Sequence, residues 1–117
     1  MKDFRKLKVW EKAHLLTLKI YKVTKGYPKE ELYGLTSQIR RACVSIPTNI
    51  AEGCVRSSDA DFARFLYIAL GSTSELEYLI VLLNDLKFIE NELQVELNNE
   101  INEIKKMLIT LIKKLKA

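Results

Sequence analysis

Basic side chains are concentrated in the first half of this 117-residue sequence, where they could contact phosphate groups. Residues 1–56 carry 12 basic and 5 acidic side chains, a net charge of +7. Lys attracts phosphate by charge, and the guanidinium of Arg can also donate two parallel hydrogen bonds to one anion. The candidates for binding nucleic acid or a partner are Arg5, Lys8, Lys12, Arg40, Arg41 and Arg56.

A second set of polar residues recurs at helical spacing. Gln38, Arg41, Ser45, Asn49 and Glu52 are three or four residues apart, so they share one face of a helix. This face could bind phosphate or a partner's carboxylates, or it could be an ordinary solvated face. Its amide, hydroxyl and guanidinium groups favour specific polar packing, for which a subunit interface is one setting. The predicted polar strip comprises Gln38, Ser45, Asn49, Glu52, Glu75 and Glu77.

Residues suited to catalysis or metal binding are scarce. The sequence contains one His and two Cys. It has neither a Gly-rich phosphate loop nor a nucleophile elbow. Glu75 and Glu77 are two residues apart and do not face each other on a helix. We therefore predict that the protein is not an enzyme and has no cofactor and no metal site.

Helices must position these side chains. Apolar residues recur every three or four positions over 6–25 and 35–53, from Ser58 or Asp59 to Leu86, and from Asn91 to Leu115. The connections are short, so neighbouring helices should pack antiparallel. We predict an all-α, up-down-up-down four-helix bundle that forms a single domain over 1–117. The expected core stripes are Val9, Ala13, Leu16, Ile20 and Val23; Leu35, Ile39, Cys43, Ile46 and Ile50; Phe62, Phe65, Ala69, Ser72, Leu76, Leu79, Leu83 and Leu86; and Leu97, Ile101, Ile104, Leu108, Leu111 and Leu115.

Local signals refine these helices. Pro47 lies inside the second helix and has no N–H for the carbonyl of Cys43, so we expect a kink there rather than a break. Gly53 and the polar residues after it should end this helix. Asn91 and Gln94 resemble a capping box at the start of the fourth helix.

The third helix has more apolar surface than one bundle can bury. Segments 65–70 and 78–83 are apolar on every side of the helix. A helix of this kind is normally covered all round, which predicts a homo-oligomer. The charge distribution supports this prediction, because residues 57–104 carry a net charge of −8 and the first half of the chain is basic. A subunit with oppositely charged flanks can close into a ring, although pairing within one chain would use the same charges.

The sequence also predicts where the protein resides. Its N-terminus lacks the uninterrupted apolar region of a signal peptide, and the third helix contains Glu75 and Glu77, which disfavour a membrane span. We expect a cytoplasmic protein that does not bind membranes. Cys43 and Cys54 lie about 16 Å apart along one helix, which is too far for a disulfide.

Four segments are similar to a known family. They are 4–10 with Ala13, 31–42, the motif Ser-Ile-Pro-Thr-Asn-Ile-Ala-Glu-Gly at 45–53, and 65–72 with Glu75 and Glu77. Together they resemble the four-helix-bundle family of 23S rRNA intervening-sequence proteins over nearly the whole chain. The resemblance implies a bacterial four-helix bundle whose related structures are ring-shaped homopentamers and whose biochemical role is mostly unassigned.

The family is also similar to the accessory variability protein of diversity-generating retroelements, a strongly basic pentamer that binds nucleic acid and a reverse transcriptase. This chain departs from that protein because its net charge is only +4 and its third helix is acidic. The leading hypothesis is a non-enzymatic homopentamer that acts as an RNA- or nucleoprotein-binding adaptor, with RNA or a nucleic-acid enzyme as its partner. The alternative is a protein-interaction scaffold with no nucleic-acid role, in which Arg40 and Arg41 pair with carboxylates such as Glu75 and Glu77.

Overall fold

The computed structural model describes residues 2–117, and every regular element in that part of the chain is helical. Its long helices are α1 (Lys8–Thr24), α3 (Leu35–Cys54), α4 (Asp59–Asp85) and α5 (Asn91–Lys116). A 3₁₀ turn, η1 (Phe4–Lys6), precedes α1, and the one-turn helix α2 (Lys29–Leu32) precedes α3.

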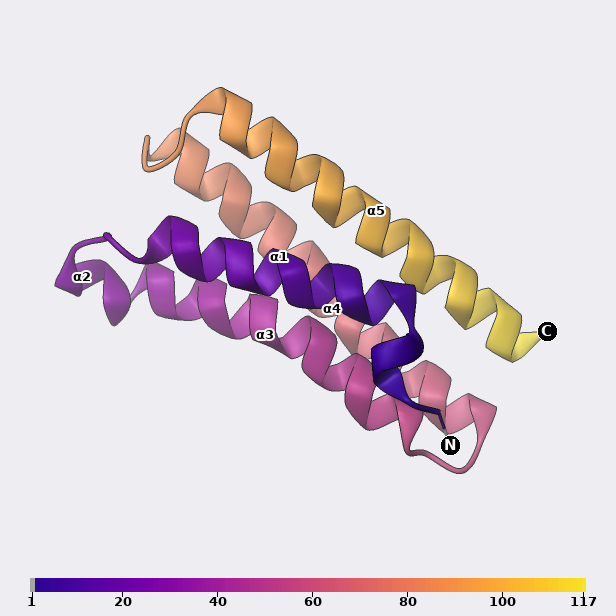
Figure 1. Ribbon diagram of the computed structural model, residues 1–117. Coiled ribbons are helices and arrows are strands. Elements are labelled where there is room, and N and C mark those ends of the chain that lie inside the picture. The colour runs from indigo at the N-terminus through magenta and orange to yellow at the C-terminus, as the bar shows by residue number, and fades with distance from the viewer. Residues whose placement is uncertain (1) are drawn as a thin grey trace.

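The long helices run alternately up and down, as Figure 1 shows. α1 packs against α3 and α5, and α4 packs against the same two helices, so α1 and α4 lie diagonally opposite each other. Both chain termini lie at one end of the bundle (Figure 1). The predicted all-α bundle is therefore confirmed.

The core forms where the apolar stripes predicted it. Ile39, Ile46 and Ile50 of α3 are fully buried, and so are Leu16 and Ile20 of α1. Burial of one such side chain contributes about 1.5–3 kcal/mol to folding. The tight packing extends to Gly53, one residue before the end of α3 at Cys54, so the helix ends within one residue of its predicted end. A Cβ at Gly53 would lie 2.8 Å from the Phe62 ring, so the glycine allows α3 and α4 to approach closely.

The predicted stripe of α5 is wrong at its C-terminal end. Ile112 is buried there, whereas Leu111 and Leu115 are half-buried. A straight helix has about 3.6 residues per turn, so a strict seven-residue repeat drifts away from the core. The drift turns Leu111 and Leu115 toward the sides of the bundle. In α4 the stripe fails at its last predicted member, because Leu86 follows the helix and is 53% exposed.

Pro47 is accommodated by a contact that sequence spacing did not suggest. α3 continues through Pro47, and the bend expected there stays a prediction. Proline removes the helical hydrogen bond to the Cys43 carbonyl. The buried Thr17 hydroxyl of α1 donates to Ala13 O at 2.8 Å and is also 3.3 Å from Cys43 O. The single hydroxyl hydrogen of Thr17 is therefore shared between the two carbonyls, and Cys43 O receives the longer hydrogen bond from the neighbouring helix.

The link between α4 and α5 differs from the predicted capping box. Glu90 is the N-cap of α5 and its side chain makes no capping hydrogen bond. Asn91 instead accepts a hydrogen bond from Asn84 Nδ2, at 2.9 Å. The hydrogen bond between the two Asn side chains joins the end of α4 to the start of α5. Asn91 therefore stabilises the loop and does not cap α5.

Lys87 adopts a strained conformation at the end of α4, with φ of 65°. Phe88 N donates to Leu83 O at 2.9 Å and Lys87 N to Asn84 O at 3.0 Å, which is the Schellman pattern that usually has Gly at this position.

Lys87→Gly should therefore stabilise the protein by about 0.5–1 kcal/mol, because glycine adopts a positive φ without a Cβ clash. Urea unfolding measures this change. Exposed Lys25→Gly, outside such a conformation, is the control and should not be stabilising; a loss of stability for Lys87→Gly would contradict the assignment.

α4 is the one helix among the described residues that is long and apolar enough to cross a membrane by length and composition. Core helices of soluble bundles pass the same test. Leu66, Leu76 and Ile80 of α4 are buried against the other helices of the bundle. The apolar surface on these sides of α4 is therefore buried inside the bundle.

Candidate nucleic-acid interface and polar contacts

Two members of the predicted polar strip, Gln38 and Ser45, contact α4 within the same chain. Ser45 Oγ and Ser72 Oγ share a hydrogen bond at 2.8 Å, and Asn49 Nδ2 donates to Ser45 O and Ser45 Oγ at 2.8 and 3.0 Å. Gln38 Nε2 donates to Glu75 Oε2 at 3.5 Å. The strip therefore provides specific polar packing between two helices of one subunit.

Two other members of the predicted strip lie apart from these contacts. Glu52 is exposed on α3. Glu77 forms an ion pair with Lys105 of α5 at 2.7 Å, so it belongs to the α4–α5 contact. The predicted set is thus divided between the α3–α4 and α4–α5 contacts and an exposed position, so it does not form one surface.

Arg40 is engaged by the end of α1. Its Nε donates to the buried Thr24 Oγ1 at 2.9 Å, and its guanidinium lies 4.5 Å from the centroid of the Tyr21 ring. Its Nη2 also donates to Tyr21 O at 3.4 Å. A cation at a helix C-terminus satisfies free carbonyls and complements the helix dipole. Arg41 is exposed, so of the adjacent pair it presents the more accessible charge.

The remaining candidate cations lie nearer the terminal end of the bundle. Arg5 and Arg56 each stack on a phenylalanine, at 4.6 Å from the Phe4 centroid and 4.3 Å from the Phe65 centroid. Lys8 is exposed at the start of α1. The six predicted residues are therefore separated, because Arg41 lies about 20 Å along α3 from its terminal end.

Acidic residues of α5 neutralise part of the basic first half. Lys12 pairs with Glu103 at 2.8 Å, and Lys19 pairs with Glu96 and Glu100 at 2.9 and 2.7 Å. Hydrogen bonds to Glu103 and Glu100 raise the pKa values of Lys12 and Lys19, respectively. The predicted intrachain alternative thus holds for these lysines, which are less available to a ligand than spacing suggested.

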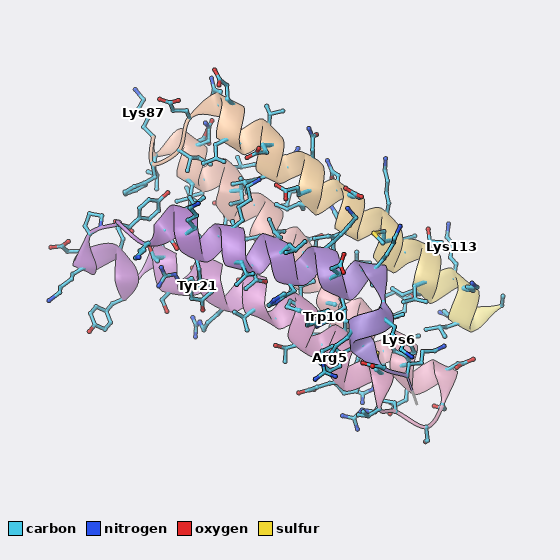
Figure 2. The ribbon with its side chains drawn as sticks, in the orientation of Figure 1. Arg5, Lys6, Trp10, Tyr21, Lys87 and Lys113 are labelled. Atoms are coloured by element: carbon cyan, nitrogen blue, oxygen red, sulfur yellow. The ribbon has the colours of Figure 1, made fainter. Side chains whose placement is uncertain are left out.

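A basic cluster that no sequence segment defines lies at the terminal end. Figure 2 shows Arg5 and Lys6 near α1 at the same end of the molecule as Lys113 of α5. All three side chains are exposed. Lys2 N donates to Cys54 O at 2.9 Å, which holds the N-terminal segment against α3. Both chain ends are basic in the sequence, but of these three residues only Arg5 was a predicted site residue. The folded topology brings the two chain ends to the same end of the bundle.

The two thiols are buried and separate. The Cys43 Sγ donates to Thr17 Oγ1 at 3.5 Å, and burial raises the pKa of its thiol to about 11. Burial also raises the pKa of the Cys54 thiol. Both cysteines are free, in agreement with the predicted absence of a disulfide between them. A thiolate is the nucleophilic form, so burial and a raised pKa make a thiol less reactive than an exposed one. Among residues 2–117, no three or more His, Cys, Asp and Glu side chains gather closely enough to hold a metal ion.

These features define an all-α bundle in which polar side chains join neighbouring helices and exposed cations from both chain ends lie at one end. The chain belongs to the 23S rRNA-intervening sequence protein family, whose model matches residues 5–110. The predicted family is therefore confirmed. Neither the family description nor the structural relative below indicates a catalytic activity.

A solved structure is similar to this chain over most of its length. It is a protein of unknown function from the S23 ribosomal protein family of Bacteroides thetaiotaomicron, with 35% sequence identity and a TM-score of 0.83. The alignment covers 90% of this chain and 95% of the other. A comparison with curated proteins gave no match.

Proposed function

We propose that this protein is a non-enzymatic adaptor that binds RNA or a nucleoprotein through the terminal end of the bundle. The observation that supports this function is the convergence of exposed cations from both chain ends, with Arg5 and Lys6 near Lys113 (Figure 2). Such cations contact phosphates and give affinity without reading sequence. The membership in a family named for intervening sequences of 23S rRNA is consistent with an RNA ligand.

The alternative hypothesis is a protein-interaction scaffold with no nucleic-acid role. It predicts that Arg40 and Arg41 pair with carboxylates such as Glu75 and Glu77. Within this chain those carboxylates are used by Gln38 and Lys105 instead. Arg41 is left exposed, which favours a ligand or partner outside the chain.

We further propose that the adaptor is a ring-shaped homo-oligomer, with the pentamer as the expected size. α4 exposes Tyr67, Ile68, Tyr78 and Val81, with exposed fractions between 38% and 61%. Gly71 and Ser74 are exposed on the same helix, and such small residues allow a neighbouring helix to approach closely. A run of exposed apolar and small residues along one helix is typical of a subunit interface.

Replacing the terminal cations should weaken RNA binding. The combined change Arg5→Gln, Lys6→Gln and Lys113→Gln removes three positive charges from the terminal end. Loss of three phosphate contacts should lower affinity for a structured RNA hairpin about tenfold or more near 0.15 M salt and flatten the salt dependence. Fluorescence anisotropy with a labelled hairpin measures both effects.

The matched control is Lys22→Gln, Lys25→Gln and Lys29→Gln, which removes the same charge from exposed lysines at the opposite end. This control should retain wild-type affinity. Equal losses in the two triple variants would mean that only net charge matters, and the proposed site at the terminal end would then be wrong.

A further inference from the structure

The last turns of α5 extend beyond the helix that covers them. α1 has 17 residues and α5 has 26, so α5 is longer by about 14 Å. Before α1, the chain turns toward α3, where Lys2 N bonds to Cys54 O. Figure 1 shows the C-terminal turns of α5 running past the start of α1. One side of α5 is therefore uncovered at this end.

A groove lies along this uncovered side. Its volume is about 360 Å³, and it runs between the start of α1 and the C-terminal half of α5. Leu7, just before α1, and Val9 of α1 contribute apolar surface on one side, and Met107 and Leu111 of α5 contribute it on the other. Leu111 reaches the groove because the stripe of α5 drifts out of the core at this point. The groove is thus a consequence of helix periodicity as well as of helix length.

The rim of the groove is positively charged. Lys8, Lys106 and Lys114 line it, all three are exposed, and no Asp or Glu is among the lining residues. None of these lysines forms an ion pair with another residue of the part of the chain that the structure describes. By contrast, Lys12 and Lys105 close by are paired with Glu103 and Glu77. The groove therefore combines an apolar floor with uncompensated positive charge.

We propose that this groove binds an acidic amphipathic helix of a protein partner. The apolar side chains of that helix would lie on Met107 and Leu111, and its flanking carboxylates would pair with Lys8, Lys106 and Lys114. The lysines at 106 and 114 are separated by about 12 Å along α5, which is close to two helical turns. This length suits a partner with apolar residues at i, i+3, i+4 and i+7.

Other ligands fit the groove less well. A phosphate backbone would use the lysines but would leave the apolar floor without a partner. A free fatty acid requires a pocket that encloses most of its surface, whereas this groove is open to solvent along α5. The proposal does not depend on RNA binding, because none of Arg5, Lys6 and Lys113 lines the groove.

A synthetic peptide tests the proposal. The probe is a fluorescein-labelled helical peptide with Leu at i, i+3, i+4 and i+7 and Glu at most other positions. We expect it to bind the wild-type protein in fluorescence anisotropy at physiological salt. A peptide of equal charge with Ser in place of each Leu, and one with Gln in place of each Glu, should bind at least about tenfold more weakly.

Two protein variants locate the binding. Thr110 is exposed and lines the groove, so Thr110→Trp should fill it without disturbing the core. Lys106→Glu with Lys114→Glu should reverse the charge of the rim. Each should weaken the peptide about tenfold or more, whereas Lys22→Glu with Lys25→Glu should not. Circular dichroism should show the same helicity for all variants.

Three results would overturn the proposal. The first is equal binding of the Leu and Ser peptides, which would mean non-specific attraction by charge. The second is unchanged peptide binding by Thr110→Trp together with impaired binding of an RNA hairpin, which would assign the groove to nucleic acid. The third is a reduced assembly mass for Thr110→Trp in light scattering, which would mean that a second copy of this chain fills the groove.

Discussion

Leu79→Glu should unfold the protein, whereas Leu82→Glu should leave the subunit folded and separate it from its neighbours. Leu79 is 2% exposed in the core and Leu82 is half-buried on the same helix. A carboxylate at position 79 would be buried without a partner, at a cost of about 4 kcal/mol or more. That cost approaches the total stability of about 5–15 kcal/mol that a domain of this size has.

Circular dichroism and light scattering separate the two effects. Leu79→Glu should lose most of its helical signal at room temperature. Wild type should elute with a mass several times 13.5 kDa, and Leu82→Glu should keep its helicity at a lower mass. Tyr78→Glu, at a position that is 61% exposed, should behave like Leu82→Glu. A wild-type monomer at micromolar concentration would contradict the proposed oligomer.

Thr17→Val should be strongly destabilising, although the substitution only replaces a hydroxyl with a methyl group. The valine would fill nearly the same space but leave the Cys43 carbonyl without the Thr17 hydroxyl, and the Cys43 thiol without its acceptor. An unsatisfied buried polar group costs about 1–3 kcal/mol. We expect a loss of about 2 kcal/mol in the free energy of unfolding, measured with urea, and a smaller loss for Thr17→Ser.

A double-mutant cycle with Pro47→Ala identifies the cause. Alanine restores a backbone N–H at position 47, which can donate to Cys43 O as in an ordinary helix. Thr17→Val should therefore cost about 1 kcal/mol less in the Pro47→Ala background than in wild type. Equal costs in the two backgrounds would show that the Thr17 hydroxyl does not compensate for the proline.

Periodicity predicted the bundle and most of its core because helices of this length must bury one stripe. It failed at positions that are determined by side-chain hydrogen bonds or by backbone conformation. Thr17 and Thr24 are buried, although a pattern of apolar and polar residues places Thr with the polar face. The Thr17 hydroxyl donates to Ala13 O and the Thr24 hydroxyl donates to Ile20 O, each one helical turn back, which satisfies the polar atom inside the core. Lys87 likewise takes a position that sequence rules assign to glycine.

The candidate site was harder to predict than the fold. Charge counts found the basic chain ends, but spacing along the sequence does not show which lysines meet a carboxylate from another helix. Lys12 and Lys19 turned out to be paired, whereas Lys106 and Lys114 are free of ion pairs among the described residues and line a groove. Arg40 was predicted as a ligand-binding residue, and its guanidinium bonds to the end of α1. These differences depend on contacts between helices that are far apart in sequence.

The most direct test of the proposed adaptor function is fluorescence anisotropy of the wild-type protein with a structured rRNA-like hairpin and a matched DNA duplex, at low and at physiological salt. The adaptor function predicts binding that prefers the hairpin and persists at physiological salt, because proteins recognise the shape and 2′-hydroxyls of RNA. Binding that appears only at low salt and equally for DNA would reflect the net charge of +4 alone and would contradict the function proposed here.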